Sequence, residues 1–600
     1  MKPGFLNKPV SHIFLIIVLS LLAYSNTFQG SFAFDDGRFI VKNPLVKDLS
    51  YFPNPLKITG HNIHYVFKSR FMAYFTFALN YKLHGFDVTG YHIFNLLIHI
   101  INALLLYYLV IISFKTHFLN KSPIKDYSGY IALSAALLFA CHPIQTQAVT
   151  YIYQRVASLA TMFYLLSLVM YIKARLSSTS ASTLTCYAVS FISAVLAMRT
   201  KEIAFTLPVI ITLYEFMFLR GKIKTRLLYL VPILLTMLII PLTLINLDKP
   251  VGELIGDVSE ATKIYSSASR LDYLFTEFRV IMTYIRLIFL PVNQNLDYDY
   301  PLYHSLFNPE VLLSFIFILS LFGIGIYLFY RYRDSATHTR LITFGILWFF
   351  ITLSVESSII PIADVINEHR MYLPSAGVFL LLSAAVFTVT EKLKARWVKI
   401  EALVILSLLV IAVVLTGATY ARNAVWKDEV TLWEDVVSKS PNKARGQNNL
   451  GVAYKSMGLI EKAIKQYQIT IRLNPNSQKA YNNIGAAYYD QNLNDKAIEH
   501  FKIAIKLDPD FLEAHYNLGV AYISNGLAEK AIEHFKIAIR LRQNSPEAHN
   551  NLGVAYKFLG LMDKAIEHYQ IAIRLKPDFL KAHNNLADAY AYKGLIDKAP

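Results

Sequence analysis

The sequence predicts an all-α protein in which a polytopic bundle of about eleven membrane-spanning helices is followed by a solenoid of helical repeats. Apolar runs close to the roughly 20 residues of a spanning helix recur from residue 9 to about residue 419. Hydrophobic residues make up 54% of the chain and charged residues 16%, and the mean hydropathy is positive. From residue 443 onward, polar sequence repeats every 34 residues. We therefore expect a membrane domain over residues 1–420 and a repeat domain over residues 421–600.

The first apolar run, residues 12–27, follows Lys2 and Lys8 and could be mistaken for a secretory signal. The sequence after it, AYSNTFQGSFAF, offers only a poor cleavage site, so we expect the run to be retained as the first span. The further expected spans are residues 91–113, 128–142, 147–172, 183–199, 203–219, 227–246, 310–330, 340–361, 374–391 and 400–419.

Short connections rich in Lys and Arg stay cytoplasmic, and here they fall on alternate connections. Their basic residues are Lys115, Lys121, Lys125, Lys173, Arg175, Arg220, Lys222, Lys224, Arg226, Arg331, Arg333, Arg340, Lys392, Lys394, Arg396 and Lys399. The run from Phe278 to Pro291 is short and holds two arginines, so we interpret it as a re-entrant or surface helix. The connection with Asp35 and Asp36, the 247–309 connection and the repeats then share the non-cytoplasmic face.

The net charge of +17 does not indicate nucleic-acid binding, because much of the excess lies in these short connections. We expect no nucleic-acid partner. Cys141 and Cys186 both lie in apolar runs and give neither a disulfide framework nor a metal-binding spacing. The sequence has no Gly-rich phosphate loop and no His-Glu-x-x-His motif. It assigns no cofactor and no metal ligand, and a need for a divalent metal stays open.

Ionisable residues gather at span ends on the non-cytoplasmic face. The stretch FAFDDGRF places Asp35, Asp36 and Arg38 just after the first span. The others are His142 in CHPIQTQ, Arg155 in YIYQRVASLA, Lys201 and Glu202 in MRTKEIAF, and Glu368, His369, Arg370 and Tyr372 in NEHRMYLPS. Charges there are costly unless they are paired or functional. We therefore predict that these residues form one site.

Several of these residues also have a purely structural interpretation. Lys201 could extend its ammonium to lipid phosphate, Glu368 and Arg370 could form an ion pair, and His142 could simply end a helix. Asp-Asp-Gly is good turn chemistry. Arg155, about two turns into an apolar helix, has the least room to reach water. Convergence on one face favours a site over these separate explanations.

Such a set suits the transfer of a group from a lipid phosphate to a hydroxyl. A carboxylate can take the proton of the attacking alcohol, while Arg and Lys neutralise charge on the departing phosphate. Asp35 would then stand where a soluble acceptor meets a lipid-borne donor. Because no nucleotide-binding signature is present, the donor's energy would come from the lipid.

The 34-residue period is typical of tetratricopeptide repeats, whose paired helices stack into a superhelix with a concave groove. The recurring residues are Gly451, Gly485, Gly519 and Gly553, then Tyr454, Tyr488, Tyr522, Tyr556 and Tyr590, then Ala463, Ala497, Ala531, Ala565 and Ala599. A fifth unit stops at Pro600 before its second helix, so we expect a shortened or uncapped array.

Asparagine recurs at one position in the first helix of every unit: Asn449, Asn483, Asn517, Asn551 and Asn585. A row of side-chain amides could pair with the backbone of an extended acceptor peptide, whatever its sequence. Asparagine is also common at this position for packing between repeats. The sequence leaves both interpretations open.

Nearly all of the chain resembles the TMTC family of transmembrane and tetratricopeptide-repeat O-mannosyltransferases, which have the GT-C fold, and the resemblance is to a prokaryotic-type member. It rests on an ordered set of motifs ahead of the repeats: FAFDDGRFIVKNP, SRFMAYFTFALNYKLHGFDVTGYHIFNLLIH, HPIQTQAVTYIYQRVASLA, TKEIAFTLPV and NEHRMYLPSAG. The resemblance implies an inverting transfer of a sugar, typically mannose, from a polyprenyl-phosphate carrier to Ser or Thr of a protein.

The family's aspartate dyad matches Asp35 and Asp36, so the resemblance implies that Asp35 is the base and Asp36 a positioning partner. It implies donor-binding roles for residues in the matching motifs, and we count Arg38, His142, Arg155, Lys201, Glu202, Glu368, His369 and Arg370 as candidates. The family's Glu-Arg pair is here Glu368-His369-Arg370, which leaves open which cation faces the donor.

Two other functions compete with a protein O-glycosyltransferase. One is polymerisation or ligation of lipid-linked glycans, which would rely on a large late extracytoplasmic loop. The other is a non-catalytic scaffold that gathers partners through the repeats. A transporter fits less well, because the ionisable residues cluster at one face rather than at the midplane. The membrane would be the cytoplasmic membrane of a prokaryote or the endoplasmic reticulum of a eukaryote.

Overall fold

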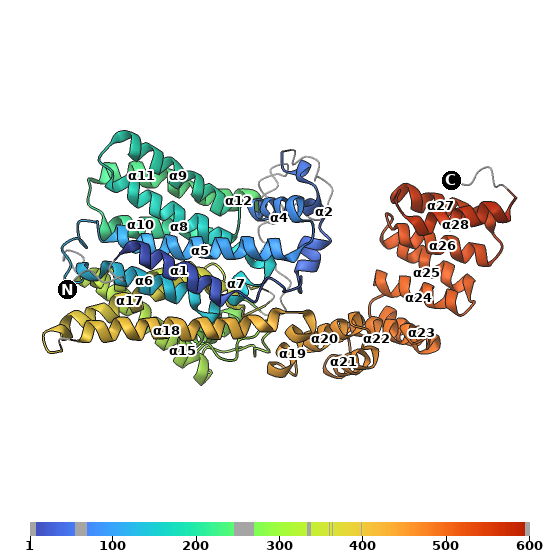
Figure 1. The fold of residues 1–600 in the computed structure, drawn as a ribbon. Coiled ribbons are helices and arrows are strands. Elements are labelled where there is room, and N and C mark those ends of the chain that lie inside the picture. Colours follow the sequence, from blue (N-terminus) through green and yellow to red (C-terminus); the bar gives the residue numbers. More distant parts are fainter. Residues whose placement is uncertain are drawn as a thin grey trace. The chain divides into compact units, whose positions relative to one another are not determined.

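The computed structural model describes residues 8–53, 69–244, 269–332, 338–358, 361–362, 364–397 and 399–594, and these residues form helices and turns without a β-strand. The expected all-α class is therefore confirmed. The chain divides into two compact units, Met1–Leu432 and Trp433–Pro600 (Figure 1). Each unit is described separately.

The helices of the first unit include one or more within each of the eleven expected spans, but α8 begins at Arg155 rather than near residue 147, and α16 ends at Leu353 rather than near residue 361. They are α1 (Pro9–Ala23), α2 (Pro44–Lys47), α4 (Phe71–His84), α5 (Val88–Ser113), α6 (Ser128–Cys141), α7 (Thr146–Val149), α8 (Arg155–Leu176), α9 (Ser180–Met198), α10 (Leu207–Phe218), α11 (Ile223–Leu235), α12 (Ile239–Leu244), α14 (Arg270–Phe289), α15 (Pro309–Arg331), α16 (Thr339–Leu353), α17 (Tyr372–Lys394) and α18 (Ile400–Asn423).

Seven of the described helices are long and apolar enough to cross a membrane, and the bent pair Lys125–Cys141 and Pro143–Val149 makes an eighth. Pro9–Ala23 and Thr339–Leu353 are shorter apolar helices. The unit is thus a multi-pass bundle whose number of spans stays approximate. Helix α14, which covers the Phe278–Pro291 run, is not among the seven.

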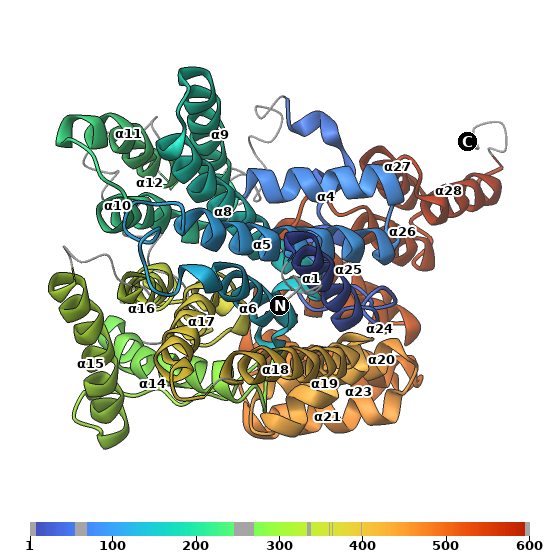
Figure 2. The ribbon, with the colours of Figure 1, turned by 60° about the vertical axis from the view of Figure 1, so that its left-hand side comes forward.

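Helices α5, α6, α8 and α17 pack in the middle of the bundle (Figure 2), and their apolar side chains belong to one buried cluster. Helices α16 and α17 approach very closely at two glycines. An added Cβ at Gly345 would lie 2.5 Å from the Gly377 carbonyl oxygen, and one at Gly377 would lie 2.4 Å from the Trp348 ring. Only glycine allows this contact. It brings the start of α17, with the NEHR motif before it, against the centre of the bundle.

The helical connections meet at two ends of this unit. At one end, which we call the site end, lie residues 24–53, 142–154, 199–206 and 364–371 together with Glu356. Contacts that join them include Tyr153 to Asp36, Gln147 to His369 and Lys201 to Glu356.

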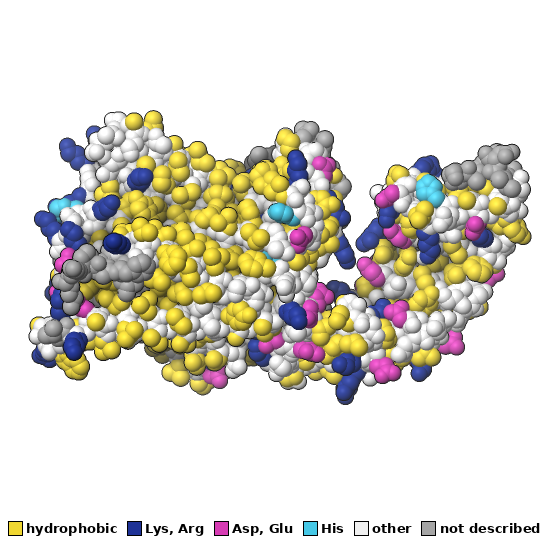
Figure 3. Space-filling model, viewed as in Figure 1, with side chains coloured by type: hydrophobic (Ala, Val, Ile, Leu, Met, Phe, Trp, Pro, Cys, Tyr) yellow, Lys and Arg dark blue, Asp and Glu magenta, His cyan; other side chains and the backbone are white. Residues whose placement is uncertain are grey.

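The opposite end, which we call the basic end, holds residues 114–127, 219–226, 340 and 394–401. There Tyr127 donates a hydrogen bond to Glu401, and Arg220 and Arg340 both cover the ring of Phe118. Lysine and arginine side chains gather at this end, on the left in Figure 3, and a hydrophobic surface follows it.

The second unit is a stack of helix pairs, as the 34-residue period predicts. After α19 (Glu429–Lys439) come α20 (Ala444–Ser456), α21 (Ile460–Leu473), α22 (Gln478–Asp490), α23 (Asn494–Leu507), α24 (Leu512–Ser524), α25 (Ala528–Leu541), α26 (Pro546–Phe558), α27 (Met562–Leu575) and α28 (Leu580–Tyr592). The repeating glycines meet aromatic rings of the paired helix, for example Gly519 against Phe535. Ala599 and Pro600 lie outside the described residues.

Candidate functional site

The aspartate turn is held in place by the backbone of the α7–α8 connection. The Oδ1 atom of Asp36 accepts a hydrogen bond from the Tyr153 backbone N–H at 2.8 Å, and its Oδ2 atom accepts one from Ala33 N–H at 3.0 Å. Phe34 turns the chain with φ of 52°. Asp35 is half-buried, whereas Asp36 is 1% exposed. The two carboxyl groups therefore differ: that of Asp36 is fixed in the protein, and that of Asp35 is the more accessible.

Burial raises the pKa of Asp36 to about 8, aided by the negative charge of Asp35 and opposed by the two backbone N–H groups and Arg155. A carboxyl group that titrates there can hold a proton near neutral pH. The Asp35 backbone N–H donates to the Tyr151 hydroxyl at 3.1 Å, and the Tyr151 ring stacks on Trp426 at 5.4 Å. The turn is thus braced on both sides.

Arg155 is fully buried, and protein acceptors surround its guanidinium. Nε donates to Asn95 Oδ1 at 2.6 Å, and Nη1 donates to Asn80 Oδ1 at 2.6 Å. Nη2 donates to the Tyr91 carbonyl at 3.1 Å, and the Phe77 ring lies 4.5 Å from the guanidinium carbon. These contacts tie α8 to α4 and α5. The sequence predicted this residue as donor-binding, and the structure places it within the protein core behind Asp36.

Arg70 links the aspartate turn to the TKEIAF motif. Its Nη1 atom donates to the Tyr153 hydroxyl at 2.8 Å, and its Nη2 atom lies 3.6 Å from Glu202 Oε2. Tyr153 therefore contacts Asp36 through its backbone and Arg70 through its side chain. Burial would raise the pKa of Glu202, but the charges of Arg70 and Lys201 outweigh it and lower that pKa.

Three cations surround His369. Lys201 Nζ lies 2.6 Å from Glu356 Oε1, and Arg370 Nη1 lies 3.8 Å from Glu277 Oε1. The charges of Lys201, Arg370 and Arg70 all act on the half-buried His369 ring. The backbone N–H of His369 donates to Gln147 Oε1 at 2.7 Å. The structure thus brings predicted Lys201, Glu202, His369 and Arg370 together with Arg70, Glu277 and Glu356. We call Arg70, Lys201 and Arg370 the cation group.

Glu277 is a buried carboxyl group on α14. Burial raises its pKa to about 7, while Arg370 acts in the opposite direction. Arg370 also donates to three backbone carbonyls, at 2.5 Å to Asp364, 2.9 Å to Val365 and 3.4 Å to Glu356. Its guanidinium is therefore held rigidly.

Glu368 and Arg370 have different partners, so they are not the ion pair that one interpretation allowed. Glu368 Oε2 accepts from Gln294 Nε2 at 2.7 Å, and its Oε1 atom accepts from Asn295 N–H and the Tyr298 hydroxyl at 2.7 and 2.6 Å. Glu368 thereby fixes the chain that follows α14.

His142 and Arg38 have other contacts than the residues of the cation group. His142 lies at the end of α6, where Nδ1 accepts from the Ile144 backbone N–H at 3.1 Å and Nε2 lies 2.8 Å from the Ile288 carbonyl oxygen. This geometry matches the helix-ending interpretation. Arg38 is exposed, with its guanidinium 5.2 Å from the Phe39 ring centroid.

Arg70, Glu277 and Glu356 were not predicted from the sequence. Arg70 carried the same signal as Lys201, a cation just before an apolar helix, and it lies inside the SRFMAYF motif. Glu277 lies on α14 directly before the Phe278–Pro291 run, which we interpreted as a re-entrant or surface helix. Among the described residues, no group of three or more His, Cys, Asp or Glu side chains could hold a metal ion.

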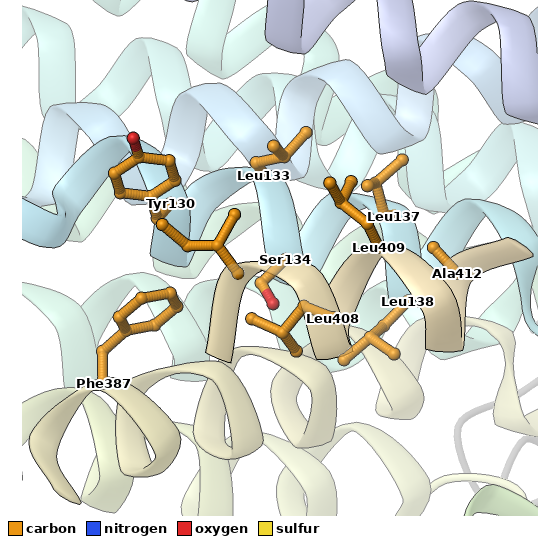
Figure 4. A pocket seen from close by; sticks show the side chains of 10 residues that line it. Tyr130, Leu133, Ser134, Leu137, Leu138, Phe387, Leu408, Leu409 and Ala412 are labelled. Atoms are coloured by element: carbon orange, nitrogen blue, oxygen red, sulfur yellow. The ribbon is translucent and has the colours of Figure 1, made fainter. Parts of the chain in front are cut away.

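An apolar cavity of about 20 Å³ lies between α6, α17 and α18, lined by residues that include Leu133, Leu137, Phe387 and Leu409 (Figure 4). The hydroxyl of Ser134 in its wall has no hydrogen-bond partner among the described residues. The cavity has no charged lining residue and is separate from the polar site.

In the second unit, the recurring asparagines link neighbouring repeats. Asn483 Nδ2 donates to Asn448 at 3.0 Å, and Asn517 Nδ2 donates to Asn482 at 2.9 Å. Asn551 and Asn585 make the equivalent contacts to Tyr516 and Asn550, and Asn449 accepts from Asn448. All five are half-buried, and Asn551 also accepts from Asn550 Nδ2 at 3.1 Å, so both sides of its amide take part in these contacts.

The chain is similar to several curated proteins that carry one name. Protein O-mannosyl-transferase F38B6.6 of Caenorhabditis elegans is 29% identical over 484 residues, 78% of this chain and 63% of the worm protein. Protein O-mannosyl-transferase TMTC3 of Homo sapiens is 25% identical over 503 residues, 77% of this chain and 51% of the human protein. TMTC4 of Mus musculus is 27% identical, over 75% of this chain and 65% of the mouse protein. The resemblance to the TMTC proteins is confirmed, and the chain spans about half to two thirds of these relatives' length.

The repeats also match known families and structures. The family described as TPR repeat matches residues 455–492, 487–526 and 521–560, and Tetratricopeptide repeat matches residues 546–579. Among solved structures, YrrB, "a TPR protein with an unusual peptide-binding site", is 22% identical, covers 28% of this chain and 86% of that chain, and has a TM-score of 0.25. MamA is 28% identical over 25% of this chain and 89% of that chain, with a TM-score of 0.24.

Proposed function

We propose that this protein is a membrane protein O-mannosyltransferase, which transfers mannose from a polyprenyl-phosphate-linked donor to Ser or Thr hydroxyls of proteins. The observation that carries the proposal is that Asp35 and Asp36 lie at the same end of the bundle as the cation group, joined to it through Tyr153 and Arg70. The names of the similar proteins support mannose and protein acceptors. The site end would be extracytoplasmic.

The accessible carboxylate and the cation group have complementary tasks in this reaction. The acceptor oxygen forms a bond to the anomeric carbon, the bond from that carbon to the phosphate oxygen breaks, and the hydroxyl proton passes to Asp35. The lipid phosphate leaves with one more negative charge, which Arg70, Lys201 and Arg370 neutralise. Glu202 and His369 line the same region and would contact the sugar or the phosphate.

Asp36 and most of the remaining predicted donor-binding residues would act on the reaction through other residues. Asp36 holds the turn that carries Asp35, and Arg155 supports that turn from the core. Glu368 and His142 fix the chain around α14, which carries Glu277 and so orients Arg370. Arg38, being exposed, would meet the donor or acceptor at the entrance.

The repeat unit would supply the acceptor. Tetratricopeptide repeats are typical of protein–protein interaction. Asn483, Asn517 and Asn585 donate through Nδ2 to the preceding repeat, and their amide carbonyls could accept hydrogen bonds from an extended peptide. Sequence-independent pairing would suit an enzyme that modifies several proteins.

The test is a transfer assay with the full-length protein in nanodiscs, polyprenyl-phosphate mannose and a Ser/Thr acceptor, read by mass spectrometry. We expect Asp35→Asn to lower kcat by about 10²- to 10⁴-fold, because one general base contributes that much. Asp87→Asn is the matched control, since Asp87 is exposed and caps α5, a role in which asparagine is equivalent. Absence of hexose transfer by the unaltered protein, or full activity of Asp35→Asn, would refute the proposal.

A further inference from the structure

Two pairs of histidines in the repeat unit each join the two helices of one repeat. The Nδ1 atoms of His515 on α24 and His534 on α25 lie 3.0 Å apart, and those of His549 on α26 and His568 on α27 lie 3.1 Å apart. The ring centroids of the two pairs are 5.2 and 5.4 Å apart, with interplanar angles of 36° and 29°. Each residue of the second pair follows its counterpart by 34 residues, so the chain builds the same arrangement twice.

A backbone carbonyl fixes the tautomer of the first ring in each pair. His515 is 4% exposed, and its Nε2 atom lies 2.9 Å from the Pro509 carbonyl oxygen. Because a carbonyl oxygen only accepts, Nε2 carries the proton and Nδ1 presents its lone pair to His534. One repeat later, His549 is hydrogen-bonded to the backbone of Gln543. Histidines that bind metals typically donate their other ring N–H to a backbone carbonyl in this way.

The spacing of the nitrogens fits a shared metal ion. A Zn–N bond is about 2.0–2.1 Å long, so two nitrogens of a tetrahedral site stand about 3.3–3.4 Å apart. The observed 3.0 and 3.1 Å are close to this separation. To present a second lone pair, His534 and His568 would move a proton from Nδ1 to Nε2, with no net gain or loss of protons. Both rings are half-buried, so water can take the remaining coordination positions.

The charges around the second rings also suit a cation. Burial and the neighbouring histidine lower the pKa of His534 and His568, and neutral imidazole is the form that binds a metal. Glu533 raises the pKa of His534 and Lys502 lowers it, and the carboxylate has the greater effect. The same order holds one repeat later. The carboxylate therefore more than offsets the lysine at each pair.

We propose that each histidine pair binds one divalent transition-metal ion such as Zn²⁺, with two imidazole nitrogens and water as ligands. Imidazole suits zinc, copper and nickel, whereas magnesium and calcium prefer oxygen ligands. Each ion links α24 to α25 or α26 to α27, so it stabilises the folded repeats. This site is independent of the proposed sugar transfer.

The test uses the full-length protein, purified in detergent without a polyhistidine tag and dialysed against a chelator. Bound zinc is counted by equilibrium dialysis and atomic emission, and the Tm of the repeat transition is followed by circular dichroism. We expect His515→Tyr/His549→Tyr to bind two zinc ions fewer than the unaltered protein, and His515→Tyr one fewer. Zinc should raise the Tm of the unaltered protein but not that of the double variant, and Mg²⁺ should raise neither.

His583→Tyr is the matched control. His583 occupies the same position one repeat after His549, and its Nε2 atom lies 2.9 Å from the Pro577 carbonyl oxygen, but no second histidine ring contacts it among the described residues. We expect this variant to bind as much zinc as the unaltered protein.

Three results would overturn the proposal: equal zinc binding by the unaltered protein and the double variant, an equal loss of zinc in His583→Tyr, or a Tm that zinc does not raise. If the tyrosines themselves disturb the fold, His534→Gln/His568→Gln decides, since the first repeat has Gln466 at this position. That variant should also lose two zinc ions, and unchanged zinc binding by it would refute the site.

Discussion

Arg70 connects the aspartate turn with the other cations of the site, because it contacts both Tyr153 and Glu202. We expect Arg70→Gln to raise the KM for the lipid-linked donor about tenfold, because a charge-assisted contact to phosphate is lost. Steady-state kinetics with varied donor measure this. Lys82→Gln, an exposed cation on the same helix α4, is the control and should leave the KM unchanged. A tenfold fall in kcat at unchanged KM would instead assign Arg70 to the transition state alone.

A substitution of Arg155 distinguishes an arginine that binds the lipid-linked donor from one that only supports the fold. In Arg155→Lys, the charge remains but the fork that binds Asn80, Asn95 and Tyr91 is lost, so buried polar groups become unsatisfied. We expect a destabilisation of about 1–3 kcal/mol or more, seen as a lower Tm in fluorescence-monitored unfolding, with the donor KM within about twofold. An unchanged Tm with a much higher donor KM would contradict the structural assignment.

The sequence predicted residue types and their face but not their partners. Lys201, His369 and Arg370 could be selected because each is a charged or polar group at a span end, where it must be compensated. Glu277 could not be selected in this way, because the sequence does not show that its helix packs its polar side inward against Arg370. Likewise, no sequence pattern indicates that Asn80 and Asn95 accept hydrogen bonds from Arg155, because in the sequence both are only polar residues within apolar stretches.

At the scale of helices, paired histidines couple neighbouring helices of the repeat unit. His515 and His534 are joined at 3.0 Å through their Nδ1 atoms, and His549 and His568 are joined in the same way at 3.1 Å. Such a hydrogen bond needs one neutral ring as acceptor. His534 and His568 also stack on Tyr522 and Tyr556, as the repeat period dictates.

These pairs should make the repeat unit less stable at acidic pH. Burial lowers the pKa of His534, His549 and His568, and for His534 and His568 the neighbouring histidine and Lys502 or Lys536 lower it further, while Glu533 or Glu567 opposes. The folded state then binds fewer protons than the unfolded state, whose histidines titrate near pH 6.5. Stability is fully present above that pH and is lost as the pH falls through it.

The variant His515→Tyr/His549→Tyr tests this linkage. It copies Tyr481, which occupies the corresponding position one or two repeats earlier and packs against His500. We expect the Tm of the repeat transition to fall between pH 7.5 and pH 5 in the unaltered protein and to fall less in the variant, as measured by circular dichroism. An equal fall in both proteins would assign the pH dependence to other groups.

The helical elements were easier to predict than their connections, for a physical reason. A spanning helix must satisfy its backbone internally, so an apolar run of sufficient length specifies it; α5, α15 and α18 follow their predicted runs closely. Connections obey no such rule. Helix α4 lies within a stretch that we had treated as part of the 28–90 connection, and its burial against Arg155 is set by tertiary contacts.

For the whole molecule, the decisive question is which membrane face holds each end of the bundle. Every predicted catalytic residue lies at the site end, whereas the clustered lysines and arginines lie at the basic end, and positive charge is retained on the cytoplasmic side. The site end should therefore be extracytoplasmic. If the site end were cytoplasmic, the lipid-linked sugar would have to be taken from the cytoplasmic leaflet, and the acceptors would be cytoplasmic proteins.

Cysteine labelling can decide this without first removing native cysteines, because Cys141 and Cys186 are 0% and 5% exposed. We expect a membrane-impermeant maleimide to label Asp87→Cys in sealed right-side-out vesicles, because Asp87 is exposed at the site end. Arg396→Cys, exposed at the basic end, should react only after permeabilisation. Asp510→Cys in the repeat unit should behave like Asp87→Cys, because α18 leaves the bundle at the site end and α19 follows directly. Labelling of Arg396→Cys but not Asp87→Cys before permeabilisation would invert the topology and rule out an extracytoplasmic transferase.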